Sequence, residues 1–146
     1  GNLSSLPSGV TYFSCIGSNT ISGNLSSLPS GVTSFSCGGS NTITGDLSSI
    51  PSGVTSFYCA GSNTISDYSG KTWASNQRTV EVRPIGAGGL SSAEVDQLLI
   101  DIDAAGGTWV SPKTIILTGT NQPRTSFSDS AVASLQSKGV TVTTTP

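Results

Sequence analysis

The chain has 146 residues, of which only 10% are charged, and a formal net charge of −2. This balance gives no basic surface for DNA or RNA and no attraction to an anionic membrane. No run of about 18 or more apolar residues occurs, so the sequence predicts no membrane insertion. Histidine is absent, which removes the usual general base of serine and cysteine nucleophiles.

The first 66 residues consist of a 22-residue unit that is repeated three times. The copies read GNLSSLPSGVTYFSCIGSNTIS from Gly1, GNLSSLPSGVTSFSCGGSNTIT from Gly23 and GDLSSIPSGVTSFYCAGSNTIS from Gly45. A fixed period in the twenties is typical of a solenoid, in which each unit stacks on its neighbour and none is stable alone. We therefore predict a domain of three stacked repeats over residues 1–66.

The second copy shows how one unit is built. Phe35 and Cys37 alternate with serines, as in a strand with one buried face. The pair Gly38-Gly39 allows a tight exit from the strand, and Pro29-Ser30-Gly31 is turn chemistry that restarts it. No part of the unit has helical periodicity, so we expect a non-helical return arm that is extended, polyproline-like or a 3₁₀ turn.

Cysteine and asparagine recur at fixed positions and predict two buried ladders. Cysteines in one column of a parallel ladder point the same way, which favours small buried thiols over disulfides, and the chain has neither histidine nor a CxxC pair for a metal. Each asparagine is expected to bond backbone groups of its own and adjacent turns, with a glycan or metal contact as the alternative. The ladder positions are Cys15, Cys37, Cys59, Asn19, Asn41, Asn63 and, in the second half, Asn121.

Residues 67–146 predict a divergent continuation that carries two helices. A loop over 67–77 precedes an alternating strand over 79–83. Ser91 and Glu94 have the spacing of a capping box, and a helix with an apolar inner face follows and ends at Gly106.

The next segment returns to the plan of the repeats. Leu117 to Asn121 has the spacing of Cys37 to Asn41, and Gly119 stands at the place of Gly39. A second helix over 128–138 and a last strand over 140–142 complete the order strand, helix, strand, helix, strand. This order implies parallel strands joined by right-handed crossovers, and it predicts a C-terminal cap for the stack.

The strings LPSGVTSFSC and GGSNTITG resemble bacterial leucine-rich repeats of the form L-P-x-x-L-x-x-L-x-C-x-x-N-x-L-T, known from Bacteroidetes surface proteins and phage-associated proteins. The chain differs in one extra residue between Cys37 and Asn41 and in a valine at the leading leucine. The resemblance implies an α/β solenoid with a parallel strand ladder: three 22-residue non-helical leucine-rich repeats over 1–66 and a βαβαβ cap over 67–146.

The candidate binding surface is the exposed face of the predicted strands. Hydroxyls and two tyrosines on a rigid sheet suit a glycan or a protein epitope, while serine and threonine also simply keep an exposed sheet soluble. The candidate positions are Thr11, Tyr12, Ser14, Thr33, Ser34, Ser36, Thr55, Ser56 and Tyr58.

Other groups are interpreted without a functional role. The carboxylates Glu94, Asp96, Asp101 and Asp103 share one predicted helix, and we expect a solvated face rather than an acid/base pair. The glycines of 86–89 lack the spacing of a phosphate-binding loop and indicate a connector.

These observations favour a non-enzymatic module with no cofactor and no metal, exposed outside the cell, on a cell surface or on a virion, with a structural or adhesive role. The alternatives are a self-assembling filament or decoration subunit and an ice- or glycan-binding solenoid, with a hydrolase last. Apolar side chains in the first repeat have no predicted polar cover, so we expect the Gly1 end to abut upstream repeats or a second subunit. These side chains are Leu3, Leu6, Val10, Phe13 and Cys15.

Overall fold

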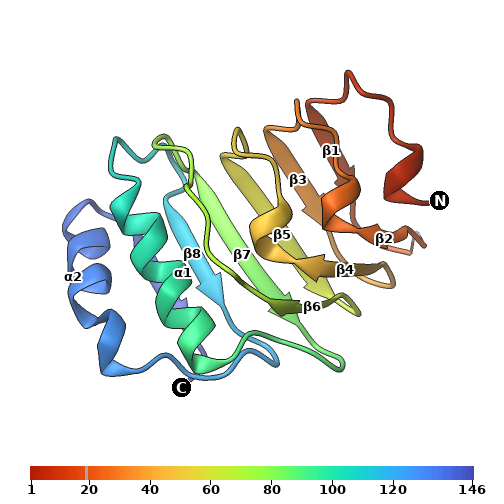
Figure 1. The fold of residues 1–146 in the computed structure, drawn as a ribbon. Coiled ribbons are helices and arrows are strands. Elements are labelled where there is room, and N and C mark those ends of the chain that lie inside the picture. Colours follow the sequence, from red (N-terminus) through yellow and green to blue (C-terminus); the bar gives the residue numbers. More distant parts are fainter. Residues whose placement is uncertain (19) are drawn as a thin grey trace.

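The computed structural model describes residues 1–18 and 20–146 and contains two parallel sheets with few helices. The larger sheet has six strands in the order β1-β3-β5-β7-β8-β9, and the smaller has three in the order β2-β4-β6. This arrangement fits a solenoid-like or α/β fold, the coarse class that the sequence predicts (Figure 1).

The elements have the following bounds. The larger sheet consists of β1 (Tyr12–Cys15), β3 (Ser34–Cys37), β5 (Ser56–Gly61), β7 (Thr79–Pro84), β8 (Thr114–Leu117) and β9 (Thr141–Thr144). The smaller sheet consists of β2 (Ser22–Asn24), β4 (Thr42–Asp46) and β6 (Thr64–Asp67). The helices are α1 (Ser92–Ala104), α2 (Asp129–Ser137) and the 3₁₀ turns η1 (Leu3–Ser5), η2 (Leu25–Ser27), η3 (Leu47–Ser49) and η4 (Ser126–Ser128).

The molecule has two layers. In Figure 1 the larger sheet lies at the back, and the 3₁₀ turns, the smaller sheet and both α-helices lie in front of it. The apolar core fills the space between the layers and contains both the strand residues of the repeats and the inner faces of the helices. The rear surface of the larger sheet therefore carries no covering layer among the described residues.

Successive repeats lie beside one another in one register. Phe13 pairs with Phe35 and Phe35 with Phe57, because a shift of one repeat places the same residue type at the same point of the next strand. Their ring centroids are 5.7 and 5.4 Å apart, and the ring planes are nearly parallel. Stacked aromatic pairs add about 0.5–1.5 kcal/mol each beyond their burial.

The return arms are built from short capped turns. The side-chain oxygens of Asn2, Asn24 and Asp46 accept hydrogen bonds from backbone N–H groups two residues further on and start η1, η2 and η3. The 3₁₀ alternative for the arm is therefore confirmed. The second sheet, formed where the arms run side by side, was not part of the sequence prediction.

The second half forms the predicted helix starts and strands. The capping box of α1 is present: Ser91 Oγ accepts from the N–H of Glu94 at 3.4 Å, and the Glu94 carboxylate accepts from the N–H of Ser91 at 2.8 Å. After β8, Gly119 has φ of +77°, close to the +74° of Gly39. The turn that leaves the strand is thus of the same kind in both halves.

The expected solvated face of α1 is wrong at one position. Asp96 is only 2% exposed, and its carboxylate accepts hydrogen bonds from the N–H and hydroxyl of Thr125 and from the hydroxyl of Ser128. Burial acts to raise the pKa of Asp96, but the hydrogen bonds from Ser128 and Thr125 outweigh it and leave the pKa below its usual value. The carboxylate joins α1 to η4 and the start of α2.

The apolar end of the first repeat is only partly open. Leu3 is fully buried within the chain itself and Cys15 is 6% exposed, which corrects the expectation that both lack cover. Leu6, Val10 and Phe13 are partly buried and pack against the core from its edge.

The described part of the chain, residues 1–18 and 20–146, holds no helix with the length and apolarity needed to cross a membrane.

Candidate functional site

The rear surface of the larger sheet, here called the outer sheet face, carries two polar rows that cross all six strands. Strand alternation turns the phenylalanines inward and their neighbours outward. The first row consists of Tyr12, Ser34, Ser56, Thr79, Thr114 and Thr141. The second row consists of Ser14, Ser36, Tyr58, Glu81, Ile116 and Thr143.

The structure thus brings six of the nine predicted surface residues onto one face, in the two rows just described. The other three are Thr11, Thr33 and Thr55, which precede their strands. The hydroxyls of Thr33 and Thr55 donate to the carbonyl oxygens of Thr11 and Thr33, at 3.2 and 3.4 Å. These two hydroxyls therefore link neighbouring repeats, and their protons are committed within the chain.

One part of the outer sheet face brings an aromatic ring, a carboxylate and a guanidinium together. We call it the Tyr58 cluster, and it consists of Gly38, Tyr58, Glu81 and Arg83. The Arg83 guanidinium lies 5.1 Å from the centroid of the Tyr58 ring, and its Nη2 is 2.9 Å from the Glu81 carboxylate. The cation over the aromatic face and the ion pair hold all three side chains in one arrangement. Arg83 Nε is buried and has no hydrogen-bond partner among the described residues.

Gly38 makes room for the ring of Tyr58. A β-carbon at Gly38 would lie 3.2 Å from Tyr58 Cε1, closer than most real contacts. The equivalent position is Ile16 in the first repeat and Ala60 in the third, so only the second repeat offers this space. The ring can therefore lie toward β3 while the guanidinium packs on it from β7.

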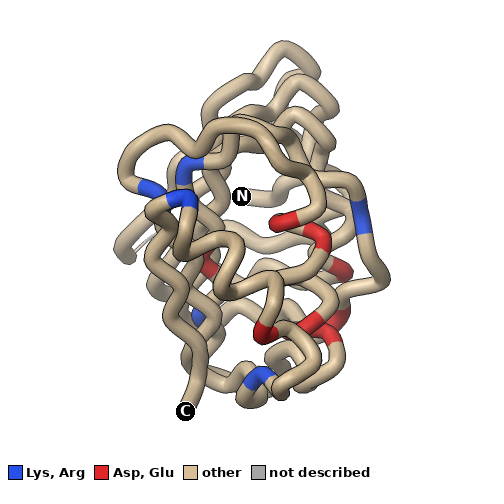
Figure 2. Tube along the Cα trace, turned by 90° about the vertical axis from the view of Figure 1, so that its left-hand side faces the viewer, with Lys and Arg blue, Asp and Glu red and all other residues tan. Residues whose placement is uncertain are grey.

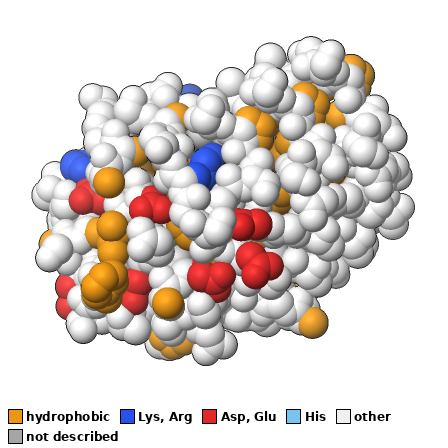
Figure 3. Space-filling view, in the orientation of Figure 1, with side chains coloured by type: hydrophobic (Ala, Val, Ile, Leu, Met, Phe, Trp, Pro, Cys, Tyr) orange, Lys and Arg blue, Asp and Glu red, His pale blue; other side chains and the backbone are white. Residues whose placement is uncertain are grey.

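Thr79 connects the cluster to the first row. Its hydroxyl donates to Glu81 Oε1 at 3.3 Å and lies 2.8 Å from the hydroxyl of Thr114. Acidic side chains gather instead on the opposite face, around α1 and β6 (Figures 2 and 3). Glu81 therefore lies among hydroxyl groups on the outer sheet face. The part of that face formed by β1 and β3 carries no charged side chain.

Sequence reasoning identified Tyr58 but missed Glu81 and Arg83. The strand over 79–83 was predicted, and its alternation places Glu81 in phase with Tyr58 once β5 and β7 are taken as neighbours. The pairing of β5 with β7 was the signal from which Glu81 could have been identified as a site residue. The contact between Arg83 and Tyr58 needs the tertiary register as well.

The asparagine ladder is hydrogen-bonded to the backbone where it is described. Asn41 Nδ2 donates to the carbonyls of Cys15 and Gly38 at 2.7 and 2.6 Å, and its Oδ1 accepts from the N–H of Ile21 at 2.7 Å. Asn63 Oδ1 accepts from the N–H of Ile43, and its Nδ2 donates to the carbonyl of Ala60. Asn19 lies outside the described residues.

Asn121 repeats this pattern across an inserted helix. It donates to the carbonyls of Val82 and Thr118 and accepts from the N–H of Leu90, at 2.7–2.9 Å. Asn41, Asn63 and Asn121 are buried and bond to backbone groups, so we interpret these side chains as holding the coil.

The cysteine column is buried and, among the described residues, its thiols are free. Burial raises the pKa of Cys37 to about 12, with a further increase from Cys15 that a hydrogen bond from Asn41 opposes. Burial also raises the pKa of Cys59 well above its ordinary value. Such thiols stay protonated at neutral pH and are poor nucleophiles.

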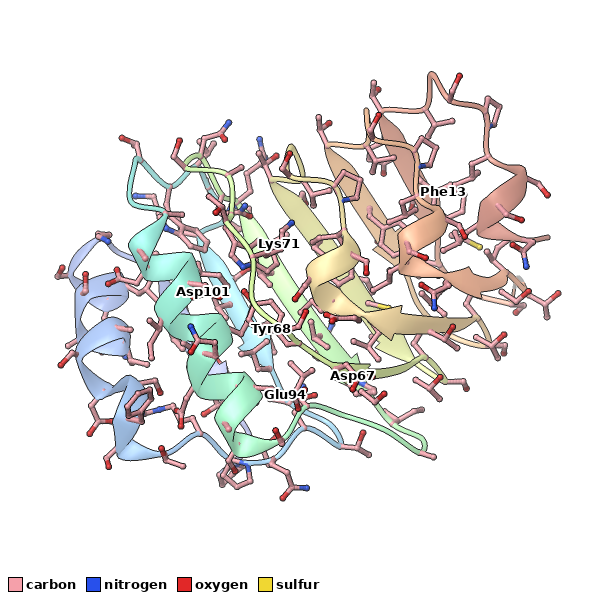
Figure 4. The ribbon with its side chains drawn as sticks, in the orientation of Figure 1. Phe13, Asp67, Tyr68, Lys71, Glu94 and Asp101 are labelled. Carbon is pink, nitrogen blue, oxygen red and sulfur yellow. The ribbon has the colours of Figure 1, made fainter. Side chains whose placement is uncertain are left out.

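A second polar cluster lies on the opposite face, beside α1 (Figure 4). Lys71 and Asp101 line a shallow pocket of about 230 Å³ there. The Tyr68 hydroxyl donates to Asp101 at 2.7 Å and accepts from Trp73 Nε1 at 2.9 Å. The Lys71 ammonium donates to the carbonyls of Ile50 and Pro51 and lies 4.8 Å from the Trp73 ring centroid.

This second cluster fastens the loop after β6 to its surroundings. Burial lowers the pKa of Lys71 to about 8, and burial together with Asp101 raises the pKa of Tyr68. Because the hydroxyl and the ammonium already bond to groups of the chain itself, we interpret the cluster as a clamp between η3 and α1. It offers a ligand fewer free groups than the outer sheet face does.

Within residues 1–18 and 20–146, no three His, Cys, Asp or Glu side chains gather in a way that could hold a metal ion. No family model, curated protein or solved structure matches the chain. The site must therefore be interpreted from its own chemistry.

Proposed function

We propose that this chain is a non-enzymatic leucine-rich repeat module that binds a glycan through the outer sheet face. In this proposal residues 1–66 form the repeats and residues 67–146 cap them. The module acts in attachment or as a structural surface protein, outside the cell or on a virion, where it meets glycans. The observation that carries the proposal is the Tyr58 cluster on a face whose two rows otherwise carry hydroxyls, with the exception of Ile116.

The side chains of the cluster match the chemistry of a sugar. A sugar ring has a C–H face that packs on an aromatic ring, and Tyr58 offers a half-buried ring held in place by Arg83. The hydroxyls of a sugar both donate and accept hydrogen bonds, which suits a guanidinium beside a carboxylate. Because the ion pair orders both groups before binding, little side-chain entropy is lost when a ligand binds.

The outer sheet face suits a glycan better than the alternatives. A protein partner would need an apolar patch at the centre of its contact, and the two rows contain one aliphatic side chain, Ile116. An ice lattice would need adjacent unbroken ladders of small hydroxyl residues. The first row begins with Tyr12, and Tyr58, Glu81 and Ile116 interrupt the second row.

The experiment is a glycan array screen followed by calorimetric titration of the best oligosaccharide. Tyr58→Ala should lower the affinity at least about tenfold, which is about 1.4 kcal/mol. Tyr12→Ala is the matched control, because Tyr12 lies on the same face two strands away and is 67% exposed. It should change the affinity less than about threefold.

Arg83→Lys tests the guanidinium separately, since lysine keeps the charge but loses the planar fork. We expect a loss similar to that of Tyr58→Ala. The oligosaccharide recovered after prolonged incubation should have an unchanged mass, as a non-enzymatic role requires. Equal affinities for Tyr58→Ala and the parent chain, or no glycan bound at all, would refute the proposal.

A further inference from the structure

The N-terminal flank of the molecule, here called the β1 edge, is the second surface with an informative structure. β1 is the first strand of the larger sheet and pairs only with β3 among the described residues, and β2 pairs with β4 and has on its other side an isolated parallel bridge between Ser22 and Asn2. Both strands lie at the end of the molecule that carries the N-terminus (Figure 1). The far side of β1 thus has backbone groups with no strand beside them.

Equivalent residues show what normally covers this flank. Val10 and Phe13 are partly buried, whereas Val32 and Phe35, one repeat later, are 0% and 1% exposed. The residue types are the same, so the difference comes only from the preceding coil that lies over the second repeat. Ile21 and Ile43 differ in burial in the same way: Ile21 is partly buried, and Ile43, one repeat later, is fully buried.

The aromatic column points the same way. Phe35 has a ring stacked on either side, with centroids 5.7 and 5.4 Å away. Phe13 has one such neighbour and lies at the end of the column (Figure 4). Its free ring face is open to a further ring at the same spacing.

The β1 edge also lacks the features that keep an edge strand solitary. Exposed edges are commonly protected by charged side chains, proline or a bulge. Residues 1–45 contain no Lys, Arg, Asp or Glu, and β1 contains no proline. Ile16, at the end of β1, is 58% exposed.

We propose that the β1 edge binds a further 22-residue coil of the same type, laid parallel to the first repeat. This occupant is the one the molecule already uses, because each later repeat is covered by such a coil. A further coil would place a phenylalanine and carbonyl groups equivalent to those of Cys15 and Thr11 at matching positions. Within the molecule, Asn41 and Thr33 donate to these two carbonyls of the first repeat. A second copy of the chain that docks through its own β1 edge would place its strand antiparallel and match none of these bonds, and its other edge strand, β9, carries Val142 at the place of the phenylalanine.

This inference does not depend on glycan binding. The test places one coil with the sequence of the second repeat before Gly1 and measures amide hydrogen exchange in β1. We expect exchange across Tyr12–Cys15 to slow at least tenfold. The control is the same added coil with serine at the places of Val32 and Phe35, which should leave exchange within threefold of the parent chain.

Two further measurements keep the inference refutable. If the extended chain does not fold, the coil is added as a synthetic peptide to the isotopically labelled parent chain, and chemical-shift changes should be confined to the first repeat and absent with the serine peptide. Sedimentation of the parent chain tests the other occupant. A dimer in which the β1 amides are already protected, or equal exchange for the matched and serine coils, would overturn the proposal.

Discussion

Asn41→Ala is the sharpest test of how the coil is held together. The change removes two donors and one acceptor and leaves the carbonyl of Gly38 and the N–H of Ile21 without partners, whereas the carbonyl of Cys15 keeps the N–H of Gly38. A buried polar group left unpaired costs about 1–3 kcal/mol. Water can reach Ile21, which is only partly buried, so we take the lower end of that range, about 1 kcal/mol, for its N–H. For the carbonyl of the buried Gly38 we take the middle, about 2 kcal/mol, and so expect a loss of about 3 kcal/mol in all.

The assay is urea and thermal unfolding followed by circular dichroism. For a domain of this size the expected loss corresponds to a fall in Tm of about 6–12 °C. Asn121→Ala should cost a similar amount, because its amide holds Val82, Thr118 and Leu90 in the same way. Ser34→Ala is the control on the outer sheet face and should stay within about 0.5 kcal/mol.

The unfolding midpoints of these variants test whether the asparagine amides hold the coil. If Asn41→Ala and Ser34→Ala unfold at the same midpoint, the asparagine amide is not what satisfies the backbone of the coil. If Asn41→Ala is costly and Asn121→Ala is neutral, the second half does not use the plan of the repeats.

Three more predictions concern the cysteine column and the turn after β8. Cys37→Ala should lower the free energy of unfolding by about 1–2 kcal/mol, measured in urea, because it leaves a small void in a packed column. Burial raises the pKa of Cys37 from 9.0 to about 12. The stabilising contribution of the buried thiol is therefore complete below pH 9 and disappears as the pH rises toward 12. Urea midpoints measured between pH 7 and 11 should fall in the parent chain and should fall less in Cys37→Ala. Gly119→Ala should cost more than Gly106→Ala, since both have positive φ but only at Gly119 would a β-carbon overlap a backbone carbonyl, that of Pro84; equal Tm values would contradict this.

Local pattern was sufficient for much of the fold. The alternation of Phe35 and Cys37 between serines predicted a strand with one buried face, and a fixed repeat length then implied its parallel neighbours. The Ser91–Glu94 spacing predicted the start of α1 because both halves of a capping box lie within one turn of chain. These features depend on residues close in sequence or on exact repetition.

The missed features depend on contacts between distant residues. Asp96 occupies a position that looks solvent-facing by periodicity alone, and it is buried by Thr125 and Ser128, about 30 positions away. The second sheet has strands of three to five residues, too short for alternation to be recognised. Glu81 and Arg83 joined the candidate site only through the register of β7 with β5.

The pairing of Thr79 with Thr114, 35 positions apart, follows the same ladder as repeats spaced by 22. A strand, a glycine and an asparagine thus recur in the coils of β3, β5 and β8, while the arm between coils is a 3₁₀ turn in one place and a whole helix in another. Insertions can accumulate in the arms without shifting any side chain on the outer sheet face. The two sides of this molecule are therefore free to change at different rates, and a strand sequence selected for one ligand could be carried unchanged into a chain whose other side is rebuilt for a new setting.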